Sequence, residues 1–134
     1  MEHIKLDQNG VWLSNDQEIT HEETKRTFFR SIVRVDEGYE LRIGRETYPV
    51  EIEDTAYFVH RFDAKSGVVT LSDQTQETLR IETLRYSPGR LSCLVKEGTA
   101  EAKFLRAPYI EVLKSLAIEK GYYGIYTNNT EGSF

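Results

Sequence analysis

The sequence is poor in residues that bind metals or form covalent cross-links. Its 134 residues include one cysteine, Cys93, and three histidines. A lone cysteine cannot form an internal disulfide or a thiolate cluster, and the histidines show no metal-ligand spacing. A chain of this length buries roughly two-thirds of the surface of its unfolded form, which is enough for a core without either. We therefore expect no metal and no cofactor. We expect Cys93 to be buried, because it lies in an apolar run.

Long apolar runs and basic clusters are also missing. No apolar run approaches the roughly 20 residues that a transmembrane helix needs, so we expect no membrane association. The first ten residues lack the basic-then-apolar order of a secretory signal, which predicts a cytoplasmic protein. Acidic residues outnumber basic residues by 22 to 17, and the basic residues are scattered. Nucleic acid is therefore not an expected partner, because its phosphates require a basic surface.

Two helices are predicted, one toward each end of the chain. Thr20 and Glu23 form a capping box, and apolar residues follow at helical spacing. This pattern predicts a helix from residue 20 to about residue 34. Pro108 is typical of the start of a second helix, and Gly121 of the position that ends one.

Between the helices, apolar and polar residues mostly alternate with the period of β-strands. Residues 91–95 are instead apolar at nearly every position, which predicts a strand covered on both faces. A change of parity within residues 77–86 predicts a bulge or a bend. Pro49 is typical of an edge strand or a strand start, because proline cannot donate to a strand ladder. The seven predicted strands lie at residues 39–43, 48–53, 56–62, 68–71, 77–86, 91–95 and 100–105.

These elements together predict an α+β fold. Its mostly antiparallel sheet of about seven strands is flanked by an N-terminal and a C-terminal helix. The length is that of a single compact unit over residues 1–134. Residues 1–6 are expected to be only a short polar lead into this unit.

One stretch of the sequence is echoed by a later one. Residues 47–58, TYPVEIEDTAYF, align with residues 99–110, TAEAKFLRAPYI, with apolar positions matched and two residues identical. A structural repeat would give two lobes, residues 1–63 and 64–134, each containing a strand that ends at a tight corner. A chance alignment is the alternative. The residues at the two corners are Asp54, Thr55, Pro108 and Tyr109.

The same segments carry a resemblance to a known family. The order of residues 10–12, 28–35, 36–41, 50–58 and 106–109 resembles the bacterial domain of unknown function numbered 1285. The resemblance covers most of the chain, from about residue 10 to residue 116. It implies an α+β fold with a repeated structural motif and a role in signalling or ligand sensing. It carries no catalytic residue over to this chain.

Three carboxylates gather near residue 54. Glu51 and Glu53 share one face of their predicted strand, and Asp54 lies at its end. They are candidates for a cation site or for a general acid–base pair, with His60 as an additional base. The alternative is a solvated strand face on which Asp54 stabilises the turn. We favour this alternative for the carboxylates, and we favour a structural role for His60, since no nucleophile lies at a motif spacing.

Aromatic residues are the other candidates, since the chain has eight tyrosines, six phenylalanines and one tryptophan. With arginines from neighbouring strands they are able to line a cleft that binds a ligand. The alternatives are core packing for the aromatic residues and cross-strand ion pairs for the arginines. The candidate binding residues are Trp12, Arg42, Tyr48, Tyr57, Arg61, Tyr86 and Tyr122.

The sequence thus favours a non-enzymatic binding or signalling module whose ligand is a small molecule or another protein. One alternative is a small metal-assisted or acid–base enzyme that uses Glu51, Glu53 and Asp54. Another is an obligate homodimer in which the Pro49 strand pairs across a two-fold axis.

Overall fold

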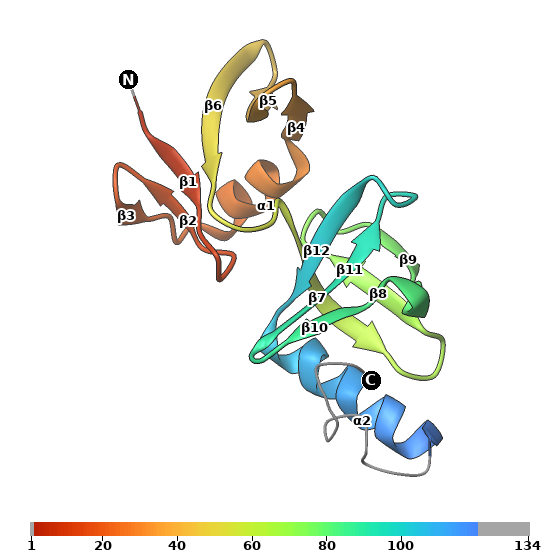
Figure 1. Cartoon of the computed structure of the whole chain (residues 1–134). Coiled ribbons are helices and arrows are strands. Elements are labelled where there is room, and N and C mark those ends of the chain that lie inside the picture. Colours follow the sequence, from red (N-terminus) through yellow and green to blue (C-terminus); the bar gives the residue numbers. More distant parts are fainter. Residues whose placement is uncertain (1, 121–134) are drawn as a thin grey trace.

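The protein has an α+β fold built on two sheets rather than one. A computed structural model describes residues 2–120, including the side chains of residues 2–116. In this part of the chain there are two six-stranded sheets, the first from residues 4–52 and the second from residues 57–104. Figure 1 shows the two sheets side by side, joined by the short segment that follows the first. The predicted α+β class is confirmed, and the prediction of one seven-stranded sheet is wrong.

The first sheet has the strand order β3-β2-β1-β6-β5-β4. Helix α1 precedes β4 in the chain and packs beside β5. The bounds of these elements are β1 Ile4–Leu6, β2 Trp12–Ser14, β3 Gln17–Glu18, α1 Glu22–Arg30, β4 Ile32–Val35, β5 Gly38–Ile43 and β6 Glu46–Ile52.

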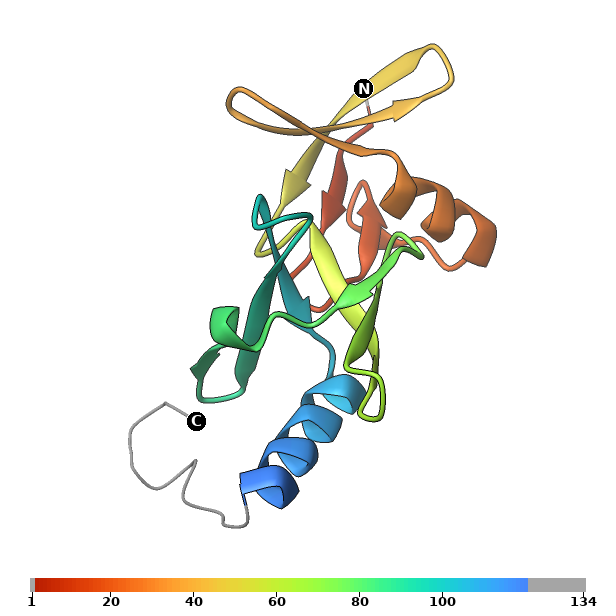
Figure 2. The same cartoon turned by 90° about the vertical axis from the view of Figure 1, so that its right-hand side faces the viewer.

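The second sheet has the strand order β10-β11-β12-β7-β8-β9. Helix α2 follows β12 and packs against β7 and β12, so each sheet has its own helix (Figure 2). The bounds of these elements are β7 Tyr57–Asp63, β8 Val68–Leu71, β9 Gln76–Thr78, the 3-10 turn η1 Ile81–Thr83, β10 Arg85–Ser87, β11 Arg90–Val95, β12 Ala100–Phe104 and α2 Arg106–Lys120.

Both sheets have the same topology. Each consists of two three-stranded antiparallel units, and its first and last strands pair in parallel at the centre. Ile4 lies opposite Val50 in the first sheet, and Tyr57 lies opposite Ala102 in the second. Val50 and Ala102 are also matched when residues 47–58 are aligned with residues 99–110. Sequence and topology therefore give the same correspondence between β6 and β12, which supports the predicted repeat.

The chain passes from the first sheet to the second at residues 53–56. Strand β7 pairs with β8 and β12, so it belongs to the second sheet. Residue 63, the predicted boundary between the lobes, lies at the start of the hairpin turn between β7 and β8. The prediction that the whole chain is one compact unit stays a prediction.

Helix α1 is shorter than predicted. It ends at Arg30, and the residues that were expected to complete it form β4. Ile32 fits both a helical stripe and an alternating strand, and the β-branched residues around it favour the strand. The N-cap is His21, whose ring nitrogen accepts a hydrogen bond from the Thr24 backbone at 3.3 Å, so the predicted capping box at Thr20 is wrong.

The remaining differences concern very short elements. Residues 4–6 and 12–14 are strands of three residues, too short for alternation to be visible in the sequence. The predicted strand at residues 77–86 is divided into β9, η1 and β10, which accounts for its change of parity. Helix α2 begins at Arg106, with the buried Pro108 in its first turn. The predicted helix stop, Gly121, lies outside the described residues.

The Pro49 strand is not an edge strand of its sheet, because β6 lies between β1 and β5. However, β1 pairs with β6 only from Val50 onward, so Pro49 itself has a strand neighbour on one side only. This agrees with a residue that cannot donate to a ladder. The homodimer stays a prediction. No helix of the described residues is long and apolar enough to cross a membrane.

Two clusters of buried residues form the cores, and β7 contributes to both. Phe58 and Val59 are completely buried and point to opposite faces of β7. Phe58 packs with Phe29 in the core of the first sheet, where the ring centroids lie 6.4 Å apart, while Val59 packs in the core of the second. Gly10, at φ +81°, lies against the Phe58 ring. The start of β7 therefore joins the two cores.

Trp12 belongs to the first core rather than to a binding surface. Its side chain is completely buried, and its ring meets Phe28 and Phe29 edge to face at centroid distances of 5.1 and 5.3 Å. A ring without exposed surface cannot stack on a ligand. Of the two interpretations offered for the aromatic residues, core packing is therefore the one that applies to Trp12.

Replacement of Trp12 tests this assignment. We expect Trp12→Ala to lower the free energy of unfolding by about 3–5 kcal/mol, because it leaves a large cavity in the core. Urea unfolding measures the loss, and Tyr48→Ala, which removes a half-buried ring from the same sheet, should cost much less. A Trp12→Ala protein as stable as the wild type would contradict the assignment.

Candidate functional site

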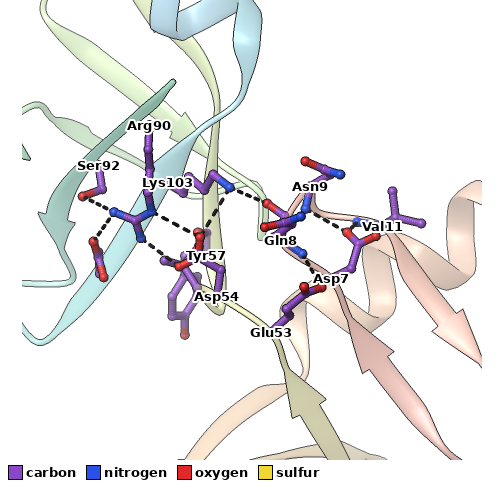
Figure 3. A network of polar contacts seen from close by, with 12 residues as sticks. Asp7, Gln8, Asn9, Val11, Glu53, Asp54, Tyr57, Arg90, Ser92 and Lys103 are labelled. Carbon is purple, nitrogen blue, oxygen red and sulfur yellow. Dashed lines mark hydrogen bonds and ion pairs between the residues drawn. The ribbon is translucent and has the colours of Figure 1, made fainter. Parts of the chain in front are cut away.

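The corner at residues 53–56 carries a polar network that crosses from one sheet to the other (Figure 3). Arg90, the first residue of β11, binds both carboxylate oxygens of Asp54, with its Nη2 at 2.8 Å and its Nε at 3.2 Å. Lys103 of β12 lies 3.4 Å from the same carboxylate, and Glu101 lies 3.2 Å from Arg90. Such a two-pronged arginine–carboxylate pair fixes orientation as well as contributing energy.

This network also reaches the first sheet. Lys103 donates to the backbone carbonyl of Gln8 at 2.7 Å, and the Gln8 amide donates to Glu53 at 3.1 Å. Figure 3 shows these groups between the turn after β1 and the strands of the second sheet. The hydrogen bond from Arg90 lowers the pKa of Asp54 most, and partial burial opposes this shift. The charge of Arg90 and the contact with Lys103 lower the pKa further. Asp54 is therefore ionised at neutral pH and holds the corner.

Thr55 connects the corner to Tyr57. The Thr55 side chain is buried, and its hydroxyl donates to the Tyr57 carbonyl at 2.8 Å. A buried hydroxyl that satisfies a backbone acceptor two residues later fixes the local backbone. This hydrogen bond therefore sets the direction of the backbone between the corner and Tyr57.

The predicted acidic cluster does not form a joint site. Glu51 pairs with His3 at 2.9 Å, Glu53 lies 3.9 Å from Lys5, and Asp54 pairs with Arg90. Each carboxylate thus has its own basic partner. Within residues 2–116, no group of three or more His, Cys, Asp or Glu side chains has a geometry that could hold a metal ion.

His60 and Cys93 have structural surroundings. The His60 ring meets Phe29 edge to face at 5.8 Å, and burial lowers its pKa, so it is neutral at pH 7. Asp63 accepts hydrogen bonds from Lys65 and Ser66 in the hairpin turn, and it makes none with His60 in the described part of the chain. Burial raises the pKa of the Cys93 thiol to about 12, as for a buried core residue.

The structure does not bring the other predicted binding residues together. Arg42 pairs with Glu40 at 2.5 Å, and the Tyr48 hydroxyl bonds to Glu46. Arg61 lines a separate hollow of about 310 Å³ on the second sheet. Tyr86 forms a hydrogen bond with Tyr109. The pKa of Tyr109 is raised, mainly by burial and to a smaller extent by this hydrogen bond. The remaining candidate, Tyr122, lies outside the described residues.

Tyr57 does line a cleft between the two sheets. The cleft has a volume of about 280 Å³. Its walls come from β4 and β5 of the first sheet, and from β7 and the β11–β12 turn of the second. The lining residues are Arg34, Tyr39, Tyr57, Lys96, Thr99 and Ala100.

Lys96 is held firmly on one side of this cleft. Its ammonium lies 5.2 Å from the centroid of the Tyr57 ring, a distance at which a cation is attracted to an aromatic face. The same ammonium donates to Asp73 at 2.7 Å and to Thr75 at 3.0 Å. Lys96 and Glu97 have φ values of 54° and 58°, in the left-handed region that costs non-glycine residues energy.

The Tyr57 hydroxyl is neutral at physiological pH. Burial raises the Tyr57 pKa, Lys96 opposes this shift, and Asp73 and Tyr39 add to it. A neutral phenol both donates and accepts hydrogen bonds. The cleft therefore offers two tyrosine side chains and two cations from four separate parts of the chain.

Sequence reasoning found Tyr57 and missed the residues around it. Arg34 ends the predicted helix, Tyr39 begins the predicted strand at residues 39–43, and Lys96 follows the predicted strand at residues 91–95. None of these residues belongs to a motif. Only knowledge that β4 and the β11–β12 turn lie together, where Arg34 donates to the Thr99 carbonyl at 3.4 Å, would have grouped them.

Replacement of Asp54 tests the role of the corner. We expect Asp54→Asn to lower the free energy of unfolding at pH 7 by about 1–2 kcal/mol, because it weakens charge-assisted bonds. Since the Asp54 pKa is lowered in the folded state, its contribution is present at neutral pH and is lost as the pH falls below about 4. Urea unfolding across this range should show a steeper loss for the wild type than for Asp54→Asn.

The matched control is Glu51→Gln, which removes an exposed carboxylate three residues before Asp54. It should change stability by less than about 0.5 kcal/mol, as is usual for surface substitutions. Equal losses in the two variants would show that Asp54 has no special role.

Comparison with known proteins supports the fold. No protein-family model and no curated protein matches the sequence. A DUF1285 family protein from Shewanella baltica OS155 has a TM-score of 0.62 at 18% identity, covering 86% of this chain and 93% of that one. A DUF1285 family protein from Silicibacter pomeroyi DSS-3 has a TM-score of 0.63 at 13% identity, covering 83% and 67%. The resemblance to this bacterial family is therefore confirmed at the level of the fold.

Proposed function

We propose that this protein is a non-enzymatic, cytoplasmic binding module of a bacterium, and that it holds a small molecule in the cleft around Tyr57. The observation that carries the proposal is the convergence of four chain segments from both sheets on one cleft. Ligands bind preferentially in clefts where two structural units of a protein meet.

The corner supports this proposal because it gives the cleft a fixed geometry. Asp54 and Thr55 set the path of the chain into β7, and Tyr57 is the first residue of that strand. A site lined by pre-positioned side chains loses less entropy on binding than one that must be ordered. Two walls from different sheets also connect ligand binding with the relative position of the sheets, which suits the signalling role that the family resemblance implies.

A small molecule fits this cleft better than a protein surface does. A volume of about 280 Å³ lies just below the usual range for ligand pockets, roughly 300–1,000 Å³, and so suits a small ligand. Protein partners generally bury about 800 Å² on each side over a broad surface.

Thermal denaturation in the presence of candidate compounds tests the proposal. The panel consists of nucleotides, metabolites, small organic acids and divalent ions. A compound present at 100 times its dissociation constant should add about 2.7 kcal/mol, which raises the melting temperature by several degrees. We expect at least one compound to do so.

Two variants then locate the binding site. Tyr57→Ala removes one wall, and Thr99→Trp fills the cleft from its exposed rim. The melting temperature of each variant is measured with and without the compound. The compound should no longer raise it in either cleft variant, but should still raise it in Tyr48→Ala, which lies outside the cleft. A rise that survives both cleft variants, or a panel without any rise, would contradict the proposal.

A further inference from the structure

Arg34 is the cleft residue whose charge is least compensated. It is exposed on β4, and within residues 2–116 no carboxylate forms an ion pair with it. Its guanidinium donates to the Thr99 carbonyl at 3.4 Å, near the limit of a hydrogen bond. A guanidinium has five N–H donors in a planar fork that matches the oxygens of a carboxylate or a phosphate. Most of these donors remain available to a ligand.

Lys96 contributes differently, because its charge is already balanced by Asp73. Two of its three N–H donors are used by Asp73 and Thr75. The third has no hydrogen-bond acceptor among residues 2–116, and the ammonium lies 5.2 Å from the centroid of the Tyr57 ring. The cleft as a whole therefore has an excess of one positive charge, located at Arg34, and favours a ligand with one anionic group.

The tyrosines determine the rest of the ligand. Tyr39 lies directly opposite Arg34 in the pairing of β4 with β5, so both side chains are on the same face of the sheet. Tyr57 faces the cleft from the other sheet. Aromatic walls pack well against a flat ring, which loses little conformational entropy on binding. The volume of the cleft admits a single ring with its acidic group and excludes a dinucleotide.

We infer that the ligand of this cleft is a small aromatic anion, in which one carboxylate or phosphate group binds Arg34 and a single planar ring packs between Tyr39 and Tyr57. This inference rests on the proposed function, because it names the ligand class of the same cleft.

Titrations followed by amide NMR spectra test the inference with matched probes. Benzoate and phenyl phosphate carry the ring and the charge, benzamide carries the ring alone, and acetate and inorganic phosphate carry the charge alone. Ionic strength is held at 0.15 M, since salt screens exposed charges. We expect at least one aromatic anion to bind about tenfold more tightly than benzamide and its ring-free counterpart, a difference of about 1.4 kcal/mol. Amides of residues 96–100 should shift.

Variants of Arg34 then separate charge from shape. Arg34→Gln should weaken the aromatic anion about tenfold and leave benzamide binding unchanged, while Arg34→Lys should retain part of the affinity. The matched control is Arg42→Gln, because Arg42 lies on the neighbouring strand and is paired with Glu40. Tighter binding of benzoate assigns the site to carboxylates, and tighter binding of phenyl phosphate assigns it to phosphates.

Three outcomes would overturn the inference: benzamide binding as tightly as the aromatic anions, an unchanged affinity in Arg34→Gln, or no binding by any aromatic anion at millimolar concentration. If a neutral compound from the thermal panel nevertheless requires Tyr57, the proposed function stands and only the anionic class is wrong. If no compound of either set perturbs residues 96–100, both proposals fail.

Discussion

The structure depends on the burial of both faces of β7 where it leaves the corner. Phe58 completes the core of the first sheet, and Val59, the next residue, lies in the core of the second. The two cores are thus connected by adjacent residues of one strand. The stability of each core therefore depends on the presence of the other. The ion pairs around Asp54 hold the corner at which the chain makes this transition, and the apolar contacts of Phe58 and Val59 follow it. The hydroxyl of Thr55 links the two, since it fixes the backbone between them.

This constraint accounts for the position of the candidate site. Tyr57 lies between the polar corner and the buried pair, and it packs partly against both cores. It can therefore neither withdraw into one core nor move freely into solvent. The cations that surround it come from places with different backbone constraints, a regular strand for Arg34 and a strained turn for Lys96. The cleft thus lies where the two similar sheets meet.

Several features of the fold were predictable from the sequence, for physical reasons. Alternation along β5, β7, β8 and β12, and the apolar run of β11, were enough to predict these strands close to their true positions. The two-residue β3 was not predicted, because so short a strand leaves no periodic signal. Ile32 matched the period of a helix and of a strand equally well, and tertiary pairing with Leu41 decided between them. The site was less predictable, since Arg34 and Lys96 are 62 positions apart and are brought together only by the packing of one sheet on the other.

The parallel pairing at the centre of each sheet has a consequence for the order of assembly. Ile4 pairs with Val50, and Tyr57 with Ala102, so the innermost contacts of each sheet join residues some 45 positions apart in the chain. Such non-local contacts close long loops, whose entropy must be overcome before the pairing stabilises anything, and they slow folding. As the chain leaves the ribosome, neither sheet has its central pair until its last strand emerges. The core of the first sheet also requires Phe58, which belongs to the first strand of the second sheet. The first core is therefore completed only when synthesis of the second sheet has begun.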